Sequence, residues 1–312
     1  MQVCLGLDTS NYTTSVAVFD GATGKNCGKL LEVPEGTLGL RQSDALFQHV
    51  KRLPGLFAAL REEGVLEDIA AVGASTRPRA VESSYMPCFL PGETVGRCLA
   101  DVLGVPFFPC AHQEGHIAAA AWSAGRLDLL DRPLLAWHLS GGTTELLHVM
   151  PAGSSIQAEI VGGTSDISAG QFIDRTGKLL GLPFPAGKTL DRLAQGEAGK
   201  ERFTVKVNDL TFSLSGMENK VKAMAEQGKP PGEIARFALD TVAGVVCRVT
   251  AEAQNRWPGL SVLCSGGVAS NTRLRYVLTE LCQAIFAAPE FSADNAMGVA
   301  ILTHRMLKEG ST

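Results

Sequence analysis

The chain has 312 residues, an apolar fraction of 45% and a formal net charge of −4. This composition supports a substantial core and argues against disorder, and the length suits two domains or one large α/β unit divided by a cleft. The acidic balance is a mild argument against nucleic-acid binding by this chain's own surface, because phosphate contacts need clustered lysine and arginine.

The eight cysteines include no CxxC pair, and several lie in apolar runs such as residues 262–264. This pattern predicts free thiols in a reducing compartment rather than disulfides. The first residues run directly into an apolar stretch without a basic leader, and no stretch reaches the roughly 20 apolar residues that span a bilayer. We therefore expect a cytoplasmic protein without a membrane partner.

Short apolar strands alternate with amphipathic helices in the first part of the chain. Strands are predicted over residues 3–7, 15–19 and 70–75, with a polar turn over 8–14. Helices are predicted over 43–63, 92–104 and 112–124, and Pro54 is a point where the first helix breaks or restarts. A polar link follows, so we expect an N-terminal lobe over residues 1–125 and a C-terminal lobe over 126–312.

The second part repeats the opening pattern. Residues 134–150 have a strand, a small polar turn and a strand, as residues 3–19 do, which indicates two related halves. Helices are predicted over 168–181 and 233–256, a buried strand over 261–265, and a further helix from about residue 271. The last helix, about 295–308, is expected to pack back on the first lobe. The alternation of strands and helices predicts an α/β fold.

Two glycine-containing turns are candidates for binding a phosphate group. Residues 140–144 read Ser-Gly-Gly-Thr-Thr, where glycines admit a ligand close to the backbone N–H groups, although an ordinary hairpin turn is an equal alternative. Gly266 and Gly267 follow a strand and precede a helix start, which would direct N–H groups and a partial positive charge at a nucleotide. Asn271 can both donate to and accept from such a ligand.

His112 and His116 have i, i+4 spacing, which places both imidazoles on one helix face within reach of a single metal ion. A solvated helix face is the alternative. The motif is not the HExxH of a zinc protease, because Glu114 stands at the wrong position. Asp294 could supply a third ligand or cap the last helix, and its position alone does not separate these roles.

In the same order, these segments resemble the tRNA threonylcarbamoyladenosine synthase (TsaD) family, once described as glycoproteases, over nearly the whole chain. Residues 170–174, 181–187 and 212–216 add further matches. The resemblance implies a two-lobed fold of the actin, sugar kinase and Hsp70-like class with a central cleft. It implies a divalent metal, iron or zinc, at His112, His116 and Asp294, and an adenine nucleotide or acyl-adenylate between the lobes. The nucleotide contacts that it implies are Leu139, Ser140, Gly141, Gly142, Thr143, Asp174, Gly187, Asp191, Gly266, Gly267 and Asn271.

The chain departs from the family pattern near the reacting centre. Two adjacent acids of the family's first turn are missing, and those positions read Asn11, Tyr12 and Thr13. Gln171 replaces a glutamate, and Thr143 replaces a histidine or asparagine. These losses indicate a divergent paralogue.

Two further departures add charge or a metal ligand. Arg77 and Arg79 replace a Gly-Pro-Gly loop. They form either a cationic turn suited to an anionic ligand or a surface loop paired with Glu82 or Glu93. His138 stands where archaeal relatives carry a tyrosine near the metal. We expect it to be a fourth ligand or a donor beside the site, with a core-facing histidine as the alternative.

The resemblance implies a transferase that moves a threonylcarbamoyl group from threonylcarbamoyl-AMP to the N6 amine of an adenosine in tRNA. Its implied partners are the adenylate, tRNA and accessory protein subunits. The missing acids favour a second hypothesis, a catalytically weak nucleotide-binding paralogue that acts as a subunit or regulator. A metalloprotease has little support beyond an old family name, and no catalytic residue is assigned.

Overall fold

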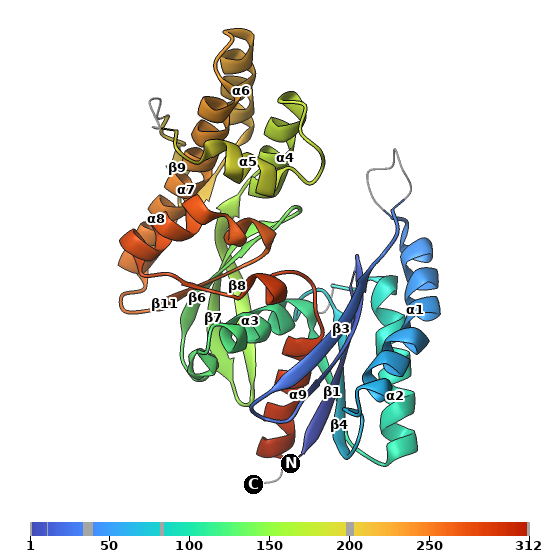
Figure 1. Ribbon diagram of the computed structural model, residues 1–312. Coiled ribbons are helices and arrows are strands. Elements are labelled where there is room, and N and C mark those ends of the chain that lie inside the picture. The colour runs from blue at the N-terminus through green and yellow to red at the C-terminus, as the bar shows by residue number, and fades with distance from the viewer. Residues whose placement is uncertain (1, 11, 34–39, 82–83, 198–202, 311–312) are drawn as a thin grey trace. The chain divides into compact units, whose positions relative to one another are not determined.

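The computed structural model describes the chain except residues 1, 11, 34–39, 82–83, 198–202 and 311–312 (Figure 1). The chain forms two compact units. The first comprises Met1–Arg132, Met150–Ala158 and Asp294–Thr312, and the second comprises Pro133–Val149 and Glu159–Ala293. The division first falls at the end of the polar link, and the last helix, α9 (Met297–Glu309), belongs to the first unit.

The first unit contains a five-stranded sheet in the order β3-β2-β1-β4-β5. Its strands are β1 (Val3–Ser10), β2 (Thr13–Phe19), β3 (Gly24–Leu30), β4 (Ile69–Arg77) and β5 (Phe107–Ala111). β1, β2 and β3 pair antiparallel, whereas β4 pairs parallel with both β1 and β5.

The predicted polar turn over residues 8–14 is wrong for most of its length. Asp8 pairs with Ser15 and Ser10 pairs with Thr13, so both sides of the turn belong to strands. These polar residues are buried, and a buried backbone needs the ladder hydrogen bonds that pairing supplies. The edge strand β3 was not predicted, because its mostly exposed sequence shows no apolar alternation.

Helices cover the sheet of the first unit: α1 (Gln42–Glu62), α2 (Leu90–Leu103), α3 (His112–Ser123) and α9. α1 continues through Pro54 without a break, and Leu53, Leu56 and Leu60 bury its apolar side. α9 lies directly on β1, because a side chain at Gly6 would bring a Cβ within 2.5 Å of the Ala300 nitrogen. Short 3-10 helices are Pro87–Phe89 and Leu127–Asp131.

The second unit is built on a seven-stranded sheet, ordered β12-β11-β6-β7-β8-β10-β9. Its strands are β6 (Leu134–Leu139), β7 (Thr144–Ala152), β8 (Ser155–Thr164), β9 (Val207–Asn208), β10 (Thr211–Phe212), β11 (Ser261–Ser265) and β12 (Ile285–Phe286). The tip of the β7–β8 hairpin, Met150–Ala158, is assigned to the first unit. The order β8-β7-β6-β11-β12 repeats the order β3-β2-β1-β4-β5 of the first sheet. The two sheets therefore share the hairpin beginning that the sequence indicates and also the strands that follow it.

The helices of the second unit are α4 (Ala169–Leu179), α5 (Gly187–Ala194), α6 (Ser215–Glu226), α7 (Pro231–Arg256) and α8 (Thr272–Cys282), with 3-10 helices at Gly267–Ser270 and Pro289–Phe291. Trp137 of β6 is fully buried and donates to Thr250 Oγ1 of α7 at 2.8 Å, which fixes α7 against the sheet. No helix in the described ranges is long and apolar enough to cross a membrane.

Candidate functional site

Three of the predicted metal ligands come together in the first unit. His112 begins α3, His116 follows one turn later, and Asp294 lies shortly before α9. The two Nε2 atoms of the histidines are 2.9 Å apart. Asp294 Oδ1 lies 3.1 Å from His116 Nε2 and 3.6 Å from His112 Nε2. The i, i+4 pair therefore faces a carboxylate rather than open solvent.

Close packing of α3 on α9 holds this arrangement. A side chain at Gly298 would place its Cβ 1.7 Å from the Gly115 carbonyl oxygen, so the helices meet backbone to backbone inside the histidine motif. Glu114 accepts from the Ala111 N–H at 2.8 Å and thereby caps α3. Asp294 does not cap α9, because Asn295 Oδ1 accepts from the Met297 N–H instead, at 3.1 Å.

The spacing of the three ligand atoms fits one ion. Ligands at 2.0–2.2 Å from a metal are about 2.8–3.6 Å apart in tetrahedral or octahedral geometry. The observed separations of 2.9, 3.1 and 3.6 Å match that range. Two imidazole nitrogens with one carboxylate suit a borderline divalent cation such as zinc or iron. His112, His116 and Asp294 can therefore supply three ligand atoms to one metal ion.

Asp8 is a member of this site that the sequence did not point to. Its Oδ2 lies 2.6 Å from His112 Nδ1, and its Oδ1 accepts from the Ser10 N–H at 2.7 Å. A carboxylate on Nδ1 fixes the imidazole tautomer and turns the Nε2 lone pair toward the ligand cluster. The signal in the sequence was an acid that follows directly after an apolar strand, but Asp8 was assigned to the polar turn over residues 8–14.

The charges of the cluster are strongly coupled. Burial opposes a positive charge on His112, but Asp8 and Asp294 outweigh it and raise the pKa of His112 to about 10. Burial also opposes the negative charge of Asp294, yet its hydrogen bonds to His112 and His116 keep the pKa of Asp294 well below its ordinary value. The protein thus holds the partly buried Asp294 as an anion beside the two imidazoles.

The two glycine-containing turns lie side by side in the second unit. β6 and β11 run parallel, with Ser265 next to His138, so the turns that follow them share one edge of the sheet. Gly266 has a φ of 95°, and a Cβ there would lie 2.1 Å from the Leu139 carbonyl oxygen, so only glycine fits. Ligands of α/β proteins commonly bind at such carboxyl ends of parallel strands.

The turn over residues 140–143 rests on the amino terminus of α4. Ser168, the N-cap of α4, donates to the Gly141 carbonyl at 2.7 Å. A Cβ at Gly170 would lie 2.5 Å from both Gly141 Cα and the Ser140 oxygen. Thr143 N–H donates to Ser140 Oγ at 3.1 Å, whereas Gly141 and Gly142 are exposed. The exposed glycines leave backbone that an anion can approach.

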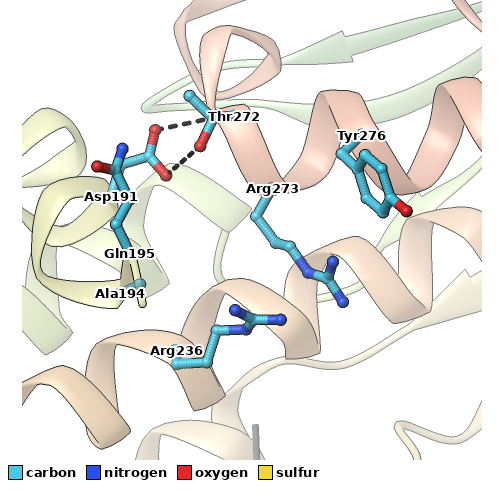
Figure 2. A pocket seen from close by; sticks show the side chains of 7 residues that line it. All are labelled: Asp191, Ala194, Gln195, Arg236, Thr272, Arg273 and Tyr276. Atoms are coloured by element: carbon cyan, nitrogen blue, oxygen red, sulfur yellow. Dashed lines mark hydrogen bonds between the residues drawn. The ribbon is translucent and has the colours of Figure 1, made fainter. Parts of the chain in front are cut away.

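The remaining predicted nucleotide contacts surround α5 and α8. Asp174 Oδ1 accepts from the Ala186 N–H at 2.8 Å, immediately before Gly187 begins α5. Asp191 accepts from the N–H of Thr272 at 3.0 Å and from its hydroxyl at 2.8 Å (Figure 2). Both carboxylates thus have internal partners but retain lone pairs for a ligand hydroxyl. Asp191 also lines a pocket of about 180 Å³ with Arg236, Arg273 and Tyr276.

Asn271 caps α8 rather than beginning it. Its Oδ1 accepts from the Leu274 N–H at 3.0 Å, and the 3-10 helix Gly267–Ser270 separates the double glycine from α8. The helix predicted from about residue 271 is α8, and the 3-10 helix before it was not predicted. The side-chain amide of Asn271 can still donate to a ligand, because the cap uses only its oxygen.

Three sequence predictions need separate comment. His138 lies on β6 in the second unit, between Glu145 and Ser265 in register, and its role as a fourth ligand stays a prediction. The Arg77–Arg79 turn adjoins the metal cluster's helix, since Gln113 N–H donates to the Pro78 carbonyl at 3.0 Å. Asn11 and Glu82, which bear on the other departures, lie outside the described residues.

Solved structures share this fold. Component A of (R)-2-hydroxyglutaryl-CoA dehydratase from Acidaminococcus fermentans has a TM-score of 0.56 and 16% identity, covering 99% of this chain and 100% of that one. HypF from T. kodakarensis has a TM-score of 0.59 and 14% identity, covering 98% and 48%. A ROK family glucokinase from Streptomyces griseus, in complex with glucose and AMPPNP, has a TM-score of 0.52 and 12% identity, covering 97% and 99%. The chain is an α/β protein of the actin, sugar kinase and Hsp70-like class.

Within that class the family is also clear. The sequence model of the tRNA N6-adenosine threonylcarbamoyltransferase family, TsaD, matches residues 41–301. The chain belongs to this family. The match begins after the first hairpin, so it does not cover the turn in which the family's two acids are missing.

Proposed function

We propose that this chain is a metal-dependent transferase of the TsaD type that modifies adenosine in tRNA, with threonylcarbamoyl-AMP as the donor and accessory protein subunits as partners. The observation that carries the proposal is the convergence of His112, His116 and Asp294 in a chain of this family. In the reaction, the N6 amine attacks the carbamoyl carbon, the bond from that carbon to the AMP phosphate oxygen breaks, and AMP and a proton leave.

Different residues of the chain would serve different parts of this reaction. His112, His116 and Asp294 would hold a divalent cation, which supplies Lewis acidity that polarises the acyl carbonyl when it is bound. Asp8, 2.6 Å from His112 Nδ1, would keep a proton on that nitrogen and leave Nε2 as the ligand atom. The turns at Ser140–Thr143 and Gly266–Gly267 would receive the phosphate through backbone N–H groups. Asp174 and Asp191 would accept from the ribose hydroxyls.

AMP release with and without tRNA tests the proposal. Protein loaded with zinc or iron is mixed with threonylcarbamoyl-AMP, and AMP is followed by chromatography. We expect tRNA-dependent AMP release and carbamoylated adenosine in the tRNA, both lost in His116→Ala. Arg126→Ala, which removes an exposed ion pair with Asp128, is the matched control. Wild-type activity in His116→Ala would exclude a metal-dependent transferase.

A catalytically weak nucleotide-binding subunit is the second candidate. The observation that favours it is the sequence Asn11-Tyr12-Thr13 in place of adjacent acids. This candidate predicts that the protein binds AMP by calorimetry but releases none in the presence of tRNA, with or without added metal. Absence of binding to ATP, ADP and AMP at millimolar concentration would count against both candidates.

A further inference from the structure

Two cysteines of the second unit face each other across two helices. Cys247 lies in α7 and Cys282 is the last residue of α8. Their Sγ atoms are 3.4 Å apart, and Cys282 Sγ is also 3.7 Å from the Cys247 carbonyl oxygen. A disulfide needs an S–S distance of about 2.04 Å, so the sulfurs would have to approach by about 1.4 Å.

Polar contacts on both sides fix this pair. Asp240 of α7 accepts from Arg273 Nε near the start of α8, at 2.6 Å. Gln254 of α7 donates to the Cys282 carbonyl at 3.2 Å. Residues 240, 247 and 254 are spaced by seven, about two helical turns, so they lie on one side of α7. The packing of α7 on α8 therefore holds the two sulfur atoms facing each other.

Cys247 of this pair is accessible whereas Cys282 is buried, and the two thiols differ chemically. Cys247 is half-buried and lines a groove of about 440 Å³ together with Phe203, Arg248 and Val277. The hydrogen-bonding contact between the two sulfurs lowers the pKa of Cys247 to about 7 and raises the pKa of Cys282. Burial instead raises the pKa of four other thiols, those of Cys4, Cys88, Cys110 and Cys264. Thiolate character and access decide which cysteine reacts with an oxidant.

We propose that Cys247 and Cys282 form a redox-active dithiol that a hydroperoxide oxidises to a disulfide joining α7 to α8. The Cys247 thiolate attacks one peroxide oxygen, the O–O bond breaks, and Cys247 becomes a sulfenic acid as the first water or alcohol leaves. The Cys282 sulfur then attacks the sulfenic sulfur, the S–S bond forms and water leaves. Two thiols lose two electrons and two protons, and the peroxide takes up both.

The bridge has a structural consequence. It closes a loop that contains β11, Gly266, Gly267 and Asn271, and it ties α8 to α7 at the end opposite to Asn271. Thiol pairs in a reducing compartment are most often transient or redox-sensing, which fits a bond made only under peroxide. Because closing a loop restricts the unfolded chain, the oxidised protein should melt at a higher temperature.

Peroxide titration of the reduced full chain tests the proposal. Equimolar hydrogen peroxide is added, free thiols are alkylated, and intact mass and peptide maps are recorded. We expect a mass loss of about 2 Da, one cross-linked peptide pair containing Cys247 and Cys282, and a rise in Tm reversed by dithiothreitol. Cys27→Ser/Cys98→Ser, which keeps the pair and removes two other cysteines that are not buried, should behave identically.

Single variants separate a reactive pair from two thiols that merely pack together. With excess hydrogen peroxide, Cys247 in Cys282→Ala should reach stable higher oxides without a cross-link. Cys247→Ser should slow peroxide-dependent thiol loss at least about tenfold, because the reactive thiolate is gone. Cys282→Ser serves as a second variant if the alanine form is unstable. Over-oxidation of Cys247 in the unsubstituted protein without a cross-link, or a disulfide that maps elsewhere, would overturn the proposal.

Discussion

The buried Asp8 and the partly buried His112 form a pair in the first unit, with Asp8 Oδ2 2.6 Å from His112 Nδ1. The pair links the end of β1 to the start of α3, segments that are 104 residues apart in the chain. Asp8 is only 1% exposed, so its carboxylate acts on the imidazole with little screening by water. The orientation of His112 therefore depends on a residue outside the ligand set.

Asp8→Asn should weaken zinc binding by about 10- to 100-fold, because His112 loses the carboxylate that fixes its tautomer. The measurement is calorimetric titration of the chelator-treated protein with zinc. Asp128→Asn, which removes an exposed carboxylate paired with Arg126 and Arg132, is the control and should bind zinc normally. Equal affinities in the two variants would leave Asp8 with a folding role only.

His138→Leu should also lower zinc affinity if His138 is the fourth ligand that we expect. Leucine cannot donate an electron pair to a metal, whereas it fills a similar volume on β6. His148→Leu, on the neighbouring strand β7, is the matched control. An unchanged affinity in His138→Leu would assign this histidine to the sheet rather than to the metal.

Gly170→Ala should reduce AMP affinity and lower stability by about 1–3 kcal/mol, because its Cβ would collide with the backbone of the turn at Ser140 and Gly141. Gly244→Ala is the matched helical control. A Cβ at Gly244 meets nothing within 4 Å, so this substitution should instead stabilise the protein by about 0.5–1 kcal/mol. Thermal melts and AMP titrations of both variants measure the stability and the AMP affinity. An unchanged AMP affinity in Gly170→Ala would show that this turn does not contact the nucleotide.

Protonation of His49 should lower the free energy of unfolding as the pH drops below about 6.5. Burial, with Arg52, lowers its pKa to about 4 against the opposing effects of Asp8 and the Ser10 backbone. Between these values the unfolded chain binds a proton that the folded chain does not, so stability rises with pH. The loss between pH 7 and pH 5 is about 2 kcal/mol. Urea unfolding at both pH values should therefore show a change in stability from pH 7 to pH 5 that is about 2 kcal/mol more unfavourable in the unsubstituted protein than in His49→Asn, since the contribution of His112 is common to both.

The double variant Arg77→Ala/Arg79→Ala should bind AMP more weakly, with a flatter dependence on salt, if this turn contacts an anionic ligand. Its place beside the start of α3 motivates the test. Arg126→Ala/Arg132→Ala removes two exposed arginines elsewhere in the first unit and provides the control. Identical affinities across a salt series would leave Arg77 and Arg79 as a surface loop.

Periodic segments of the sequence were predictable and the short polar contacts were not. The strand over residues 261–265 is β11 as predicted, and the predicted helix over 112–124 ends one residue earlier in α3. Local apolar spacing carries that information. Asp8 escaped prediction because its partner is 104 residues away, and pairing across such a distance leaves no local pattern. The role of Gly115 and Gly298 likewise follows only from the close packing of α3 on α9, which the local sequence does not show.

The shared strand order of the two sheets suggests a history for the site. β1 with β2 and β6 with β7 occupy equivalent places in the two sheets, and the sequence Leu7-Asp8-Thr9-Ser10 parallels Leu139-Ser140-Gly141-Gly142. One half carries Asp8 there and the other carries Ser140. An ancestral half-length chain, duplicated and fused, would have had the same residue in both copies. Under the proposed function, the two copies would since have diverged in charge, with a carboxylate beside a cation site in one and a hydroxyl with glycines beside an anion site in the other.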